Sequence, residues 1–469
     1  MTNSGDTICA IATPVGVSAI GVVKVSGALA LDVVSKIFRV SKGFPPLSEV
    51  EGYRAVYGFI SDPVGGELID DAMALVYRAP HSYTGEDVVE LSCHGAPLIL
   101  REVIRLLCTC GARVAEPGEY TRRALANGKM DLSQAEAVAD VIASTSRAAL
   151  RMSMTQMRGG YGERIRALRD PLIQLASLLE LELDFSEEEV EFADREELMQ
   201  RCEEVKAEIR SLADSYETGS VIKAGIPVAI VGATNAGKST LLNALLQEDR
   251  AIVSDIHGTT RDTIEEVMLI GGKEYRLIDT AGIRDTEDRI ETIGIGRALE
   301  RVAQASLILW VVDGVDPEPE TLSGILSVIL QHTQRDKLLV LVNKQDLLSP
   351  VDLERVMSTL RSLGVMEIHA ISARDRKDVE HVKGLIARRF EDLQVHEGEV
   401  IVSNLRHAEA LKRAWESLTR VSEGLQSGLP GDLVAQDLRE AIHSLSEVVG
   451  DITTDDLLHN IFAHFCIGK

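Results

Sequence analysis

The phosphate-loop stretch at residues 232–239 constrains the fold of this chain more than any other part of the sequence. Residues 228–231 are a short, wholly apolar run, as expected of a strand buried on both faces of a parallel sheet. Gly232, Gly237, Lys238 and Ser239 then give the spacing G-x-x-x-x-G-K-S, and leucines recur at helical spacing from 241 to 246. A strand, this glycine-rich turn and a helix in that order bring backbone N–H groups and a helix N-terminus onto a phosphate, with the lysine reaching the outer phosphates. A simple glycine turn does not explain Gly-Lys-Ser, so the stretch predicts a nucleoside triphosphate site.

Four further motifs follow in the order that a guanine-nucleotide site requires. They are Gly-Thr-Thr-Arg-Asp at residues 258–262, Asp-Thr-Ala-Gly at 279–282, Asn-Lys-Gln-Asp at 343–346 and Ser-Ala at 372–373. The last three follow apolar segments predicted as strands at residues 275–278, 338–342 and 368–371. A threonine of the first motif can bind magnesium, and Asp279 can hold it through water while the Gly282 N–H contacts the γ-phosphate. Together the five motifs predict that the chain binds GTP.

Asp346 is the residue expected to read the base. Its carboxylate can accept the ring N–H and the exocyclic amine of guanine, and adenine offers neither in that arrangement. A main-chain N–H of Ser372-Ala373 can meet the guanine oxygen. These groups predict selectivity for guanine over adenine.

The water-orienting residue of Ras-type small GTPases is missing from its usual place. Those proteins carry a glutamine directly after the Asp-Thr-Ala-Gly motif, whereas this chain has Ile283 there. Isoleucine cannot orient water, and Arg261, Arg284 and Arg289 give no assignable arginine finger. The catalytic group is therefore expected to come from elsewhere.

Composition and charge limit the class of protein. With 73 acidic and 49 basic side chains the formal net charge is −24, which argues against a broad basic face for nucleic acid but allows an RNA contact shared with a partner. Six scattered cysteines include no pair of C-x-x-C spacings, so neither zinc nor a disulfide framework is indicated. No apolar run approaches the roughly 18 residues that span a bilayer, and the N-terminus lacks a signal-peptide pattern. We expect a cytoplasmic protein that does not span a membrane.

The pattern along the chain predicts a multidomain α/β fold. Up to about residue 118 strands and helices mix, with strands expected at 7–12, 20–25, 72–77 and 88–92 and a helix at 98–107. A helical region begins at Leu132 with Ser133-Gln-Ala-Glu136, interpreted as a capping box, and runs to about residue 214. Strands and helices alternate from about 221 to 390, and the chain is helical again after 402. The simplest packing joins both helical segments into one domain that contains the nucleotide-binding domain as an insertion.

Two features of the helical segments allow alternative interpretations. The acidic run at residues 186–191 could bind a metal, but a solvated or capping stretch is preferred because no histidine or ligand spacing accompanies it. A second set of residues recurs at three and four positions and is interpreted as a core stripe of a helix that the Gly-Leu-Pro-Gly at 428–431 ends. The stripe consists of Leu411, Ala414, Leu418, Val421 and Leu425.

Three stretches outside the nucleotide motifs resemble one family closely. They are Pro-Gly-Glu-Tyr-Thr-Arg-Arg-Ala at 117–124, Asn-Gly-Lys-Met-Asp-Leu-Ser-Gln-Ala-Glu-Ala at 127–137 and Phe-Cys-Ile-Gly-Lys at 465–469. On these residues the chain resembles the tRNA-modification GTPase family MnmE, also called TrmE, over nearly its whole length. The resemblance implies an α+β N-terminal tetrahydrofolate-binding and dimerisation domain (1–120), a discontinuous all-α helical domain (121–218 and 386–469) and an inserted Ras-like P-loop GTPase domain (219–385).

The resemblance also implies an activity and partners. It implies a potassium-activated, magnesium-dependent GTPase that works as a homodimer with a FAD-dependent partner, MnmG (GidA), in a heterotetramer or larger complex. With tRNA bound, the pair would add an aminomethyl or carboxymethylaminomethyl group to carbon 5 of the wobble uridine. The one-carbon unit would come from 5-formyl- or methylene-tetrahydrofolate.

Residue by residue, the family's metal and catalytic positions fall on the nucleotide motifs. Ser239 and Thr260 match the magnesium ligands. Asn235, Ser254, Ile256 and Thr259 match the potassium ligands, where backbone carbonyls can serve, so an isoleucine is acceptable. A monovalent cation beside the phosphates can do the electrostatic work of an arginine finger. Glu291 matches the glutamate that positions the attacking water through a second water; its alternative is a solvated helix glutamate.

The nucleotide-binding residues implied by the motifs and the resemblance together form one set. It consists of Asn235, Ala236, Gly237, Lys238, Ser239, Thr240, Ser254, Asp255, Ile256, His257, Gly258, Thr259, Thr260, Asp279, Thr280, Ala281, Gly282, Asn343, Lys344, Asp346, Ser372 and Ala373.

The family's folate contacts fall on Lys24, Glu90, Lys129 and Lys469. A charged lysine can pair with the glutamate tail of the cofactor, and Glu90 can accept from the pterin ring. The family is associated with arginine at position 24; lysine keeps the charge but loses the bidentate fork. Cys466, in the terminal motif, is open to two interpretations, a catalytic thiol or a small buried residue.

Two other classes of function compete with the tRNA-modifying enzyme. One is a GTP-gated assembly factor, such as a ribosome-biogenesis switch that binds RNA without modifying it. The other is folate storage or transport with a vestigial GTPase. The N-terminal and C-terminal stretches argue against the first, because generic assembly GTPases lack them, and the intact nucleotide motifs argue against the second.

Overall fold

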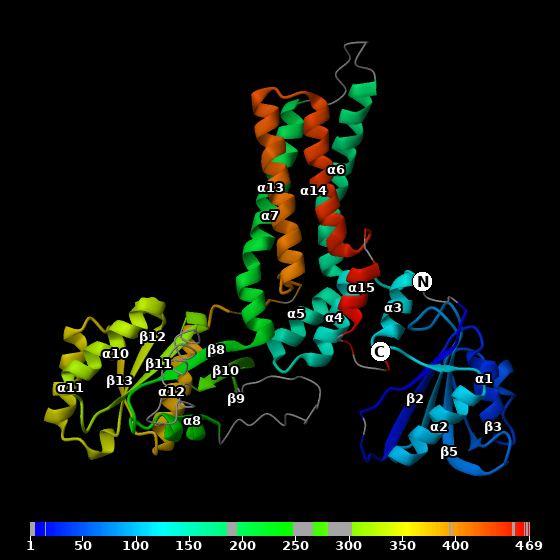
Figure 1. The fold of residues 1–469 in the computed structure, drawn as a ribbon, viewed down its shortest axis with the longest axis horizontal. Helices are drawn as coiled ribbons and strands as arrows, with labels where there is room; N and C mark the ends of the chain where they lie inside the picture. The colour runs from blue at the N-terminus through cyan, green and yellow to red at the C-terminus, as the bar shows by residue number, and fades with distance from the viewer. Residues whose placement is uncertain are drawn as a thin grey trace, which may run out of the picture. The chain divides into compact units, whose positions relative to one another are not determined.

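The computed structural model describes residues 5–14, 16–184, 195–246, 266–279, 303–393, 395–396, 398–452, 455–463, 465 and 468 (Figure 1). The chain divides into two compact units. The first contains Met1–Ile142, Met154–Arg210 and Ala410–Lys469, and the second contains Ala143–Ser153 and Ser211–Glu409. The second unit thus lies in sequence between parts of the first, as expected of an inserted domain.

A seven-stranded sheet forms the N-terminal part of the first unit. Its strand order is β3-β4-β5-β6-β2-β1-β7, and every neighbouring pair is antiparallel except the parallel pair β1–β7. The strands are β1 (Ile8–Ile11), β2 (Ile20–Ser26), β3 (Phe38–Val40), β4 (Arg54–Ser61), β5 (Leu68–Tyr77), β6 (Val88–His94) and β7 (Arg113–Val114).

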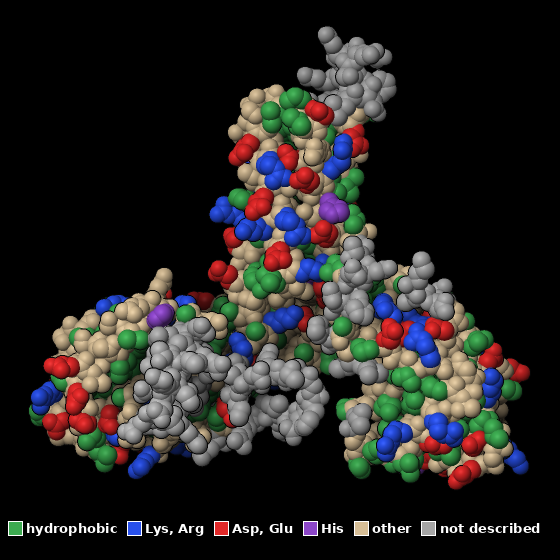
Figure 2. Space-filling model, in the orientation of Figure 1, with side chains coloured by type: hydrophobic (Ala, Val, Ile, Leu, Met, Phe, Trp, Pro, Cys, Tyr) green, Lys and Arg blue, Asp and Glu red, His purple; other side chains and the backbone are tan. Residues whose placement is uncertain are grey.

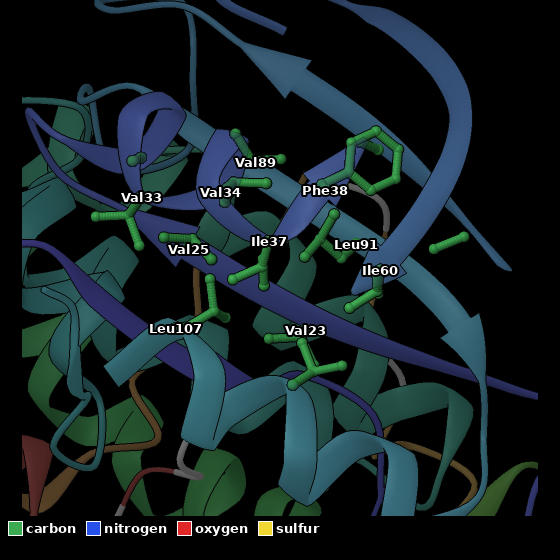
Figure 3. Close-up of a cluster of buried hydrophobic side chains, with 14 of the residues drawn as sticks. Val23, Val25, Val33, Val34, Ile37, Phe38, Ile60, Val89, Leu91 and Leu107 are labelled. Atoms are coloured by element: carbon green, nitrogen blue, oxygen red, sulfur yellow. The ribbon is translucent and has the colours of Figure 1, made fainter. Parts of the chain in front are cut away.

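Helices α1 (Ala30–Ile37) and α2 (Pro97–Thr109) bury one face of this sheet. Figure 3 shows Val23 and Leu91 from the strands beside Val34, Ile37 and Leu107 from the two helices. The alternating burial along β2 and β6 leaves Lys24 and Glu90 on the opposite face. One sheet face therefore packs against α1 and α2, and the other carries Lys24 and Glu90 beside a smaller buried cluster of Ile8, Ala10, Ala115 and Tyr120.

The predicted elements of this region are confirmed, but other elements of the region were not predicted. The strands expected at 7–12, 20–25, 72–77 and 88–92 correspond to β1, β2, β5 and β6, and the helix expected at 98–107 to α2. No element was predicted between residues 26 and 71, where the structure has α1, β3 and β4. β3 has only three residues, and its pairing to β4 depends on Gly58, where a Cβ atom would lie 2.3 Å from the Arg39 carbonyl oxygen.

The remaining helices come from two stretches of the chain and belong mostly to the first unit, but residues 143–153, 211–224 and 405–409 belong to the second. Helix α6 packs along α14, and the Arg210 guanidinium of α7 lies 5.6 Å from the Trp415 ring of α13. The interpreted core stripe is confirmed, since Leu411, Ala414 and Leu418 are fully buried, and α13 ends where the Gly-Leu-Pro-Gly begins. The helices are α3 (Glu119–Ala126), α4 (Leu132–Ala143), α5 (Arg147–Met157), α6 (Gly160–Asp184), α7 (Arg195–Ala224), α13 (Leu405–Ser427), α14 (Gly431–Val449) and α15 (Asp455–Phe462).

The capping box expected at Ser133 and Glu136 is wrong by two residues. Asp131 accepts the Gln134 N–H at 2.9 Å, and the Gln134 side-chain oxygen accepts the Asp131 N–H at 2.9 Å. This reciprocal pair makes Asp131 the N-terminal cap of α4. Ser133 lies inside the helix, fully buried, and its hydroxyl donates to Asp131.

The second unit contains a six-stranded sheet with helices on both faces. Its order is β13-β12-β11-β8-β10-β9, parallel throughout except for the β9–β10 hairpin. Helices α8 (Lys238–Leu246) and α12 (Arg376–Arg389) cover one face, and α10 (Pro319–His332) and α11 (Pro350–Ser362) cover the other. The strands are β8 (Ile226–Val231), β9 (Glu266–Ile270), β10 (Lys273–Asp279), β11 (Leu307–Asp313), β12 (Leu338–Asn343) and β13 (Ile368–Ala370). The predicted fold class, a multidomain α/β protein with a discontinuous helical domain and an inserted P-loop domain, is confirmed.

The surface and the helices of the described residues add two observations. Acidic and basic side chains are interspersed over the face seen in Figure 2, with no broad basic area on it. None of the helices in the described part of the chain is long and apolar enough to cross a membrane. The acidic run at residues 186–191 lies outside the described residues.

Candidate functional site

The predicted nucleotide site lies at the carboxyl edge of the six-stranded sheet. The phosphate loop follows β8, the Asn-Lys-Gln-Asp motif begins at the last residue of β12, and Ser372-Ala373 follows β13. Asp279 is the last residue of β10. Because parallel strands end at one edge, the described residues of the four motifs meet there, where ligands of open α/β sheets bind.

The phosphate loop has the backbone that its glycines and Asn235 suggest. Gly237 has a φ of 96°, and a Cβ atom there would lie 2.1 Å from the Asn343 side-chain nitrogen. Asn235 has a φ of 62°, in the left-handed region that asparagine tolerates better than most residues. Lys238 Nζ donates to the carbonyl oxygens of Gly232 and Ala233, each at 2.8 Å, so the ammonium lies over the loop.

Asn343 joins the phosphate loop to the base-reading loop. Its side-chain nitrogen donates to the Ala236 carbonyl at 2.8 Å, and its side-chain oxygen accepts the Ala373 N–H at 2.9 Å. The side chain is buried, so both bonds are shielded from water. The Ala373 N–H, one of the two groups that the sequence offers to the guanine oxygen, therefore has a protein partner in this structure.

Two carboxylates that the sequence analysis missed hold the same loops. Asp313, the last residue of β11, accepts from Lys344 Nζ at 2.6 Å. Asp378, in the first turn of α12, accepts the Ser372 N–H at 2.7 Å and a hydrogen bond from the Gln345 side chain. An acid at the end of an apolar strand is a signal that could have found Asp313. Asp378 had no such signal, because its role depends on how α12 leaves the loop.

The remaining described site residues face solvent. Asn235, Ser239, Thr240 and Asp346 are exposed at this edge, and Ser239 and Thr240 lie in the first turn of α8. Asp346 has no hydrogen-bond or ion-pair partner within the part of the chain that the structure describes. Several predicted residues lie outside the described residues: Ser254, Asp255, Ile256, His257, Gly258, Thr259, Thr260, Thr280, Ala281, Gly282 and Glu291.

A second polar site lies on the face of the seven-stranded sheet opposite α1 and α2. Lys24 and Glu90 are direct partners in the β2–β6 pairing, and Lys24 Nζ lies 3.6 Å from a Glu90 carboxylate oxygen. The same ammonium is 4.8 Å from the Tyr83 ring centre and 5.2 Å from that of Tyr120. Tyr77 donates to Glu90 at 3.4 Å. Burial, and then the Glu90 charge, raise the pKa of Tyr77, so its hydroxyl stays protonated.

Lys129 lies in the turn that follows α3 and is tied to the loop after β5. Its Nζ donates to the Pro80 carbonyl at 2.9 Å, while Asn127 donates to the Thr84 carbonyl at 2.7 Å. A Cβ atom on Gly85 would lie 3.1 Å from Asn127, so this turn and loop are in close contact. The structure thus ties Lys129 to the loop that carries Tyr83, the residue beside Lys24.

The three stretches that carry the family resemblance lie close together, and Ala135 of the second packs in one buried cluster with Phe465 of the third. A Cβ atom on Gly118 would lie 3.0 Å from Phe462 and Phe465, and one on Gly468 would lie 2.6 Å from the Ile11 carbonyl oxygen. The neighbouring residues Cys466 and Lys469 lie outside the described residues.

A buried ion-pair cluster anchors α3 beneath this site. Arg113 and Arg123 both donate to Glu119, and both also pair with Asp6. Burial alone would raise the pKa of Glu119, but hydrogen bonds from Arg113, the Glu116 N–H and Arg123 lower it to about 2. Glu119 is therefore a carboxylate at all ordinary pH values, and its role here is to hold the helix.

A doubly wound sheet with a phosphate loop, an Asn-Lys-Gln-Asp motif and a joining asparagine defines a P-loop GTPase of the Ras-like class. Comparison with family models extends this to the whole chain: the MnmE helical domain matches residues 132–466, and the GTP-binding protein TrmE N-terminus matches residues 7–129. The chain belongs to the MnmE (TrmE) family of tRNA modification GTPases, and it is a GTP hydrolase.

Individual relatives agree with the family models over the full length. The tRNA modification GTPase MnmE of Bacteroides thetaiotaomicron is 47% identical over 466 residues, covering 99% of both chains. That of Porphyromonas gingivalis is 48% identical over 468 residues, covering 99% of this chain and 98% of the relative. The solved FeoB G-domain from Methanococcus jannaschii is 25% identical over 36% of this chain and 98% of its own, with a TM-score of 0.27, too low to support an argument about the site.

Proposed function

We propose that this GTPase is activated by potassium and works, as a homodimer in the cytoplasm, with the FAD-dependent partner MnmG (GidA). The complex modifies carbon 5 of the wobble uridine of tRNA with a one-carbon unit from tetrahydrofolate. The observation that carries the proposal is that one chain holds two separate polar sites, the nucleotide edge and the Lys24–Glu90 pair. The family resemblance supplies what each site binds.

The phosphate loop provides the binding chemistry for GTP. Lys238 is held over the loop, where its charge stabilises the outer phosphates, and the first turn of α8 directs main-chain N–H groups toward them. The exposed Ser239 hydroxyl at that turn fits a magnesium ligand, with Thr260 as its companion and Asp279 acting through water. A bound magnesium would neutralise charge that develops on the phosphates.

Asp346 is proposed to read guanine, and its replacement by asparagine tests this. The change reverses one hydrogen-bond polarity, so Asp346→Asn should lose preference for GTP and gain for xanthosine triphosphate, whose ring carries a carbonyl in place of the amine. Competition binding of the two nucleotides measures the switch. Unchanged discrimination would show that Asp346 does not read the base.

Asn235 is proposed to recruit potassium together with Ser254, Ile256 and Thr259. Its side chain is exposed beside the phosphates' expected position, and an amide oxygen is a suitable ligand for a monovalent cation. Potassium should accelerate hydrolysis strongly and sodium should not, and Asn235→Ala should abolish the difference while largely sparing nucleotide binding. Equal turnover of the wild-type chain in both salts would remove this part of the proposal.

Glu291 is proposed to position the attacking water through a second water. Glu291→Ala should lower hydrolysis by about two orders of magnitude or more, the scale of a positioned general-base group. Nucleotide affinity should barely change, because the carboxylate contacts water and not phosphate. Single-turnover hydrolysis beside a GDP titration decides the matter, and near-normal turnover would return Glu291 to a surface role.

The Lys24 site is proposed to hold the tetrahydrofolate, with Glu90, Lys129 and Lys469. A partly buried ammonium between two tyrosine rings fits a ligand that is both aromatic and anionic, and Glu90 beside it can accept from a pterin ring. When bound, the folate would supply the one-carbon unit. The task of these residues is to hold and orient it.

Nucleoside analysis of tRNA tests the proposal as a whole. A strain that lacks this gene should lose the carbon-5 modification of wobble uridine, and plasmid-borne wild-type chain should restore it. If tRNA from the deletion strain still carried the carbon-5 modification at the wobble uridine, the proposed reaction would be overturned, although the chain would remain a GTP hydrolase of this family.

A further inference from the structure

We infer that Asp378 is a positioning residue for guanine recognition, an inference that rests on the nucleotide site proposed above. Its carboxylate oxygen accepts two hydrogen bonds, from the Ser372 N–H at 2.7 Å and from the Gln345 side-chain amide. Those two donors belong to different loops. Gln345 is the third residue of Asn-Lys-Gln-Asp, directly before Asp346, and Ser372 directly precedes Ala373.

The loops that Asp378 joins are also linked by the main chain. The Gln345 N–H donates to the Ile371 carbonyl at 3.1 Å, and the Ile371 N–H donates to the Val342 carbonyl at 2.8 Å. These two main-chain bonds fix the position of one loop relative to the other. They leave the outer ends of both loops, where Asp346 and Ala373 lie, to side-chain contacts.

Asn343 and Asp378 hold the base-reading loops from two sides. Asn343 accepts the Ala373 N–H from the phosphate-loop side, and Asp378 accepts the adjacent Ser372 N–H from the α12 side. Consecutive N–H groups of one short loop are thus each fixed by a different side chain. The loop cannot rotate about either peptide without breaking one of the two bonds.

The position of Asp378 on α12 holds both base-reading loops against a helix. It lies in the first turn of α12, directly before Val379, which is buried in the core against the sheet, so the helix that carries it is anchored separately from the two loops. A carboxylate that accepts a main-chain N–H makes a charge-assisted bond, stronger than a neutral one. Asp346 is exposed and has no partner of its own in the described part of the chain, so its orientation depends on the backbone that Gln345 anchors.

This arrangement assigns Asp378 an effect on the base and not on the phosphates. Among the described residues the carboxylate bonds to the two base-reading loops and has no hydrogen bond to the phosphate loop. Its loss frees the loops that carry Asp346 and Ala373. The expected result is weaker binding and poorer discrimination at the base.

The test compares three variants of the full-length chain, Asp378→Ala, Asp378→Asn and Asp375→Ala. Asn retains an oxygen that can accept both bonds but loses the charge. Asp375 is the N-cap of the same helix, accepts the Lys377 N–H at 2.8 Å and contacts neither base loop through its side chain, so it controls for loss of helix stability. Dissociation constants are measured for GDP and for IDP, whose base lacks the exocyclic amine.

Asp378→Ala is expected to weaken GDP binding about tenfold or more, the effect of losing charge-assisted hydrogen bonds. IDP should weaken less, so the preference for GDP over IDP shrinks. Asp378→Asn should fall between the wild type and Asp378→Ala, and Asp375→Ala should keep the wild-type ratio even if its melting temperature falls.

Two results would overturn the inference. One is a wild-type GDP/IDP ratio in Asp378→Ala, and the other is an equal fall of the ratio in Asp375→Ala, which would trace the effect to the helix. If the wild-type chain itself did not prefer GDP to IDP and ADP, the nucleotide site would be at fault, and the role of Asp378 would fail with it. The wild-type titration therefore separates failure of the nucleotide site from failure of the role proposed for Asp378.

Discussion

The two sheets of this chain build their sites by different means. In the six-stranded sheet the site consists of loops at the ends of parallel strands, and most of its contacts involve main-chain groups, such as the Ala236 carbonyl and the Ala373 N–H. In the seven-stranded sheet the site consists of side chains from the middle of paired antiparallel strands, Lys24 on β2 and Glu90 on β6.

This difference decides what sequence order can reveal. The carboxyl ends of parallel strands lie at the same edge of the sheet. Motifs that directly follow such strands therefore become neighbours, and the pairing register need not be known to predict it. Antiparallel strands bring two side chains together only through register, and a shift of one residue turns each to the other face. The first site is specified by order and the second by pairing.

Removing the Asn343 side chain should break the parallel-sheet site most severely. Asn343→Ala leaves the buried Ala236 carbonyl and the Ala373 N–H without their partner, and each unmet group costs about 1–3 kcal/mol. We expect GDP affinity to fall about 100-fold or more while tetrahydrofolate binding by the other site stays unchanged. Isothermal titration with each ligand measures both.

A matched control for Asn343→Ala is Ser349→Ala. Ser349 caps α11, which follows the same loop, and accepts the Asp352 N–H, so its loss costs helix stability without touching the site. The control should bind GDP like the wild type. If Asn343→Ala also bound GDP within threefold of the wild type, the edge loops would not depend on this joining residue.

The sequence predicted the parallel-sheet site more fully than the antiparallel one for this reason. The strands before all three later nucleotide motifs were expected and are present, so Asn343, Asp279 and Ser372 meet at one edge as their order requires. The contact of Lys24 with Glu90 was not predicted. It depends on the pairing register of β2 and β6, which the order of segments along the chain does not give. The residues themselves came only from the family resemblance.

Contacts that depend on where a helix begins or a strand ends were missed in both units. Asp378 and Asp313 reach the nucleotide loops only because of where α12 begins and where β11 ends. The capping box was placed at Ser133 because serine and glutamate fit its spacing, but Asp131 and Gln134 fit it equally well. Local pattern alone could not choose between two overlapping solutions, and the packing that buries Ser133 decided it.

Acid should loosen the antiparallel sheet before it affects the parallel one. The pKa of Glu119 is lowered to about 2, so the stability that its ionised form contributes is present above its unfolded pKa, near 4.5, and is lost as the pH falls toward 2. The loss is on the order of 3 kcal/mol. Hydrogen-exchange protection factors, which correct for the intrinsic rate at each pH, should therefore fall with decreasing pH in residues 8–26 and 113–126 before they fall in residues 226–246.

Glu119→Gln and Glu116→Gln make a matched pair for this prediction. Glu119 is fully buried with two arginines, whereas Glu116 pairs with Arg122 at an exposed position and contributes little. Glu119→Gln should raise exchange in residues 113–126 already at neutral pH and flatten its acid dependence, and Glu116→Gln should do neither. Equal behaviour of the two variants would mean that the cluster does not hold α3.

Changing Lys24 tests whether the antiparallel site binds through a side-chain charge. Lys24→Met keeps the apolar stem between the rings of Tyr83 and Tyr120 but removes the ammonium, and should weaken tetrahydrofolate binding about tenfold or more. Lys24→Arg restores the charge with a bidentate fork and should bind at least as tightly as the wild type. GDP binding should be unchanged in both, and Lys36→Met, an exposed lysine bonded to the Cys110 carbonyl, serves as the control.

Should Lys24→Met bind tetrahydrofolate normally, the ammonium would be needed only for the Glu90 pair, and the ligand would have to bind elsewhere. A variant that lost both tetrahydrofolate and GDP would point instead to general misfolding. The two titrations separate these cases, since Lys24 and the nucleotide motifs belong to different units of the chain.

The smallest effect is expected where the parallel-sheet site does use a side-chain pair. Lys344 Nζ lies 2.6 Å from Asp313, and this pair ties the end of β11 to the loop after β12. Both side chains are partly exposed, at 32% and 17%, so the pair is worth at most about 1 kcal/mol. Lys344→Met should therefore weaken GDP binding only about threefold.

A double-mutant cycle sharpens this last prediction. Asp313→Asn should cost about as much as Lys344→Met, and the double variant should cost no more than either, because each change removes the same contact. Lys344→Gly relaxes the left-handed backbone, φ 66°, while losing the same pair, so a result that differs from Lys344→Met isolates the backbone contribution. A tenfold or larger loss in Lys344→Met, coupled to Asp313, would show that the nucleotide edge also depends on a side-chain charge pair. The contrast between a site built from loop main chain and one built from paired side chains would then fail.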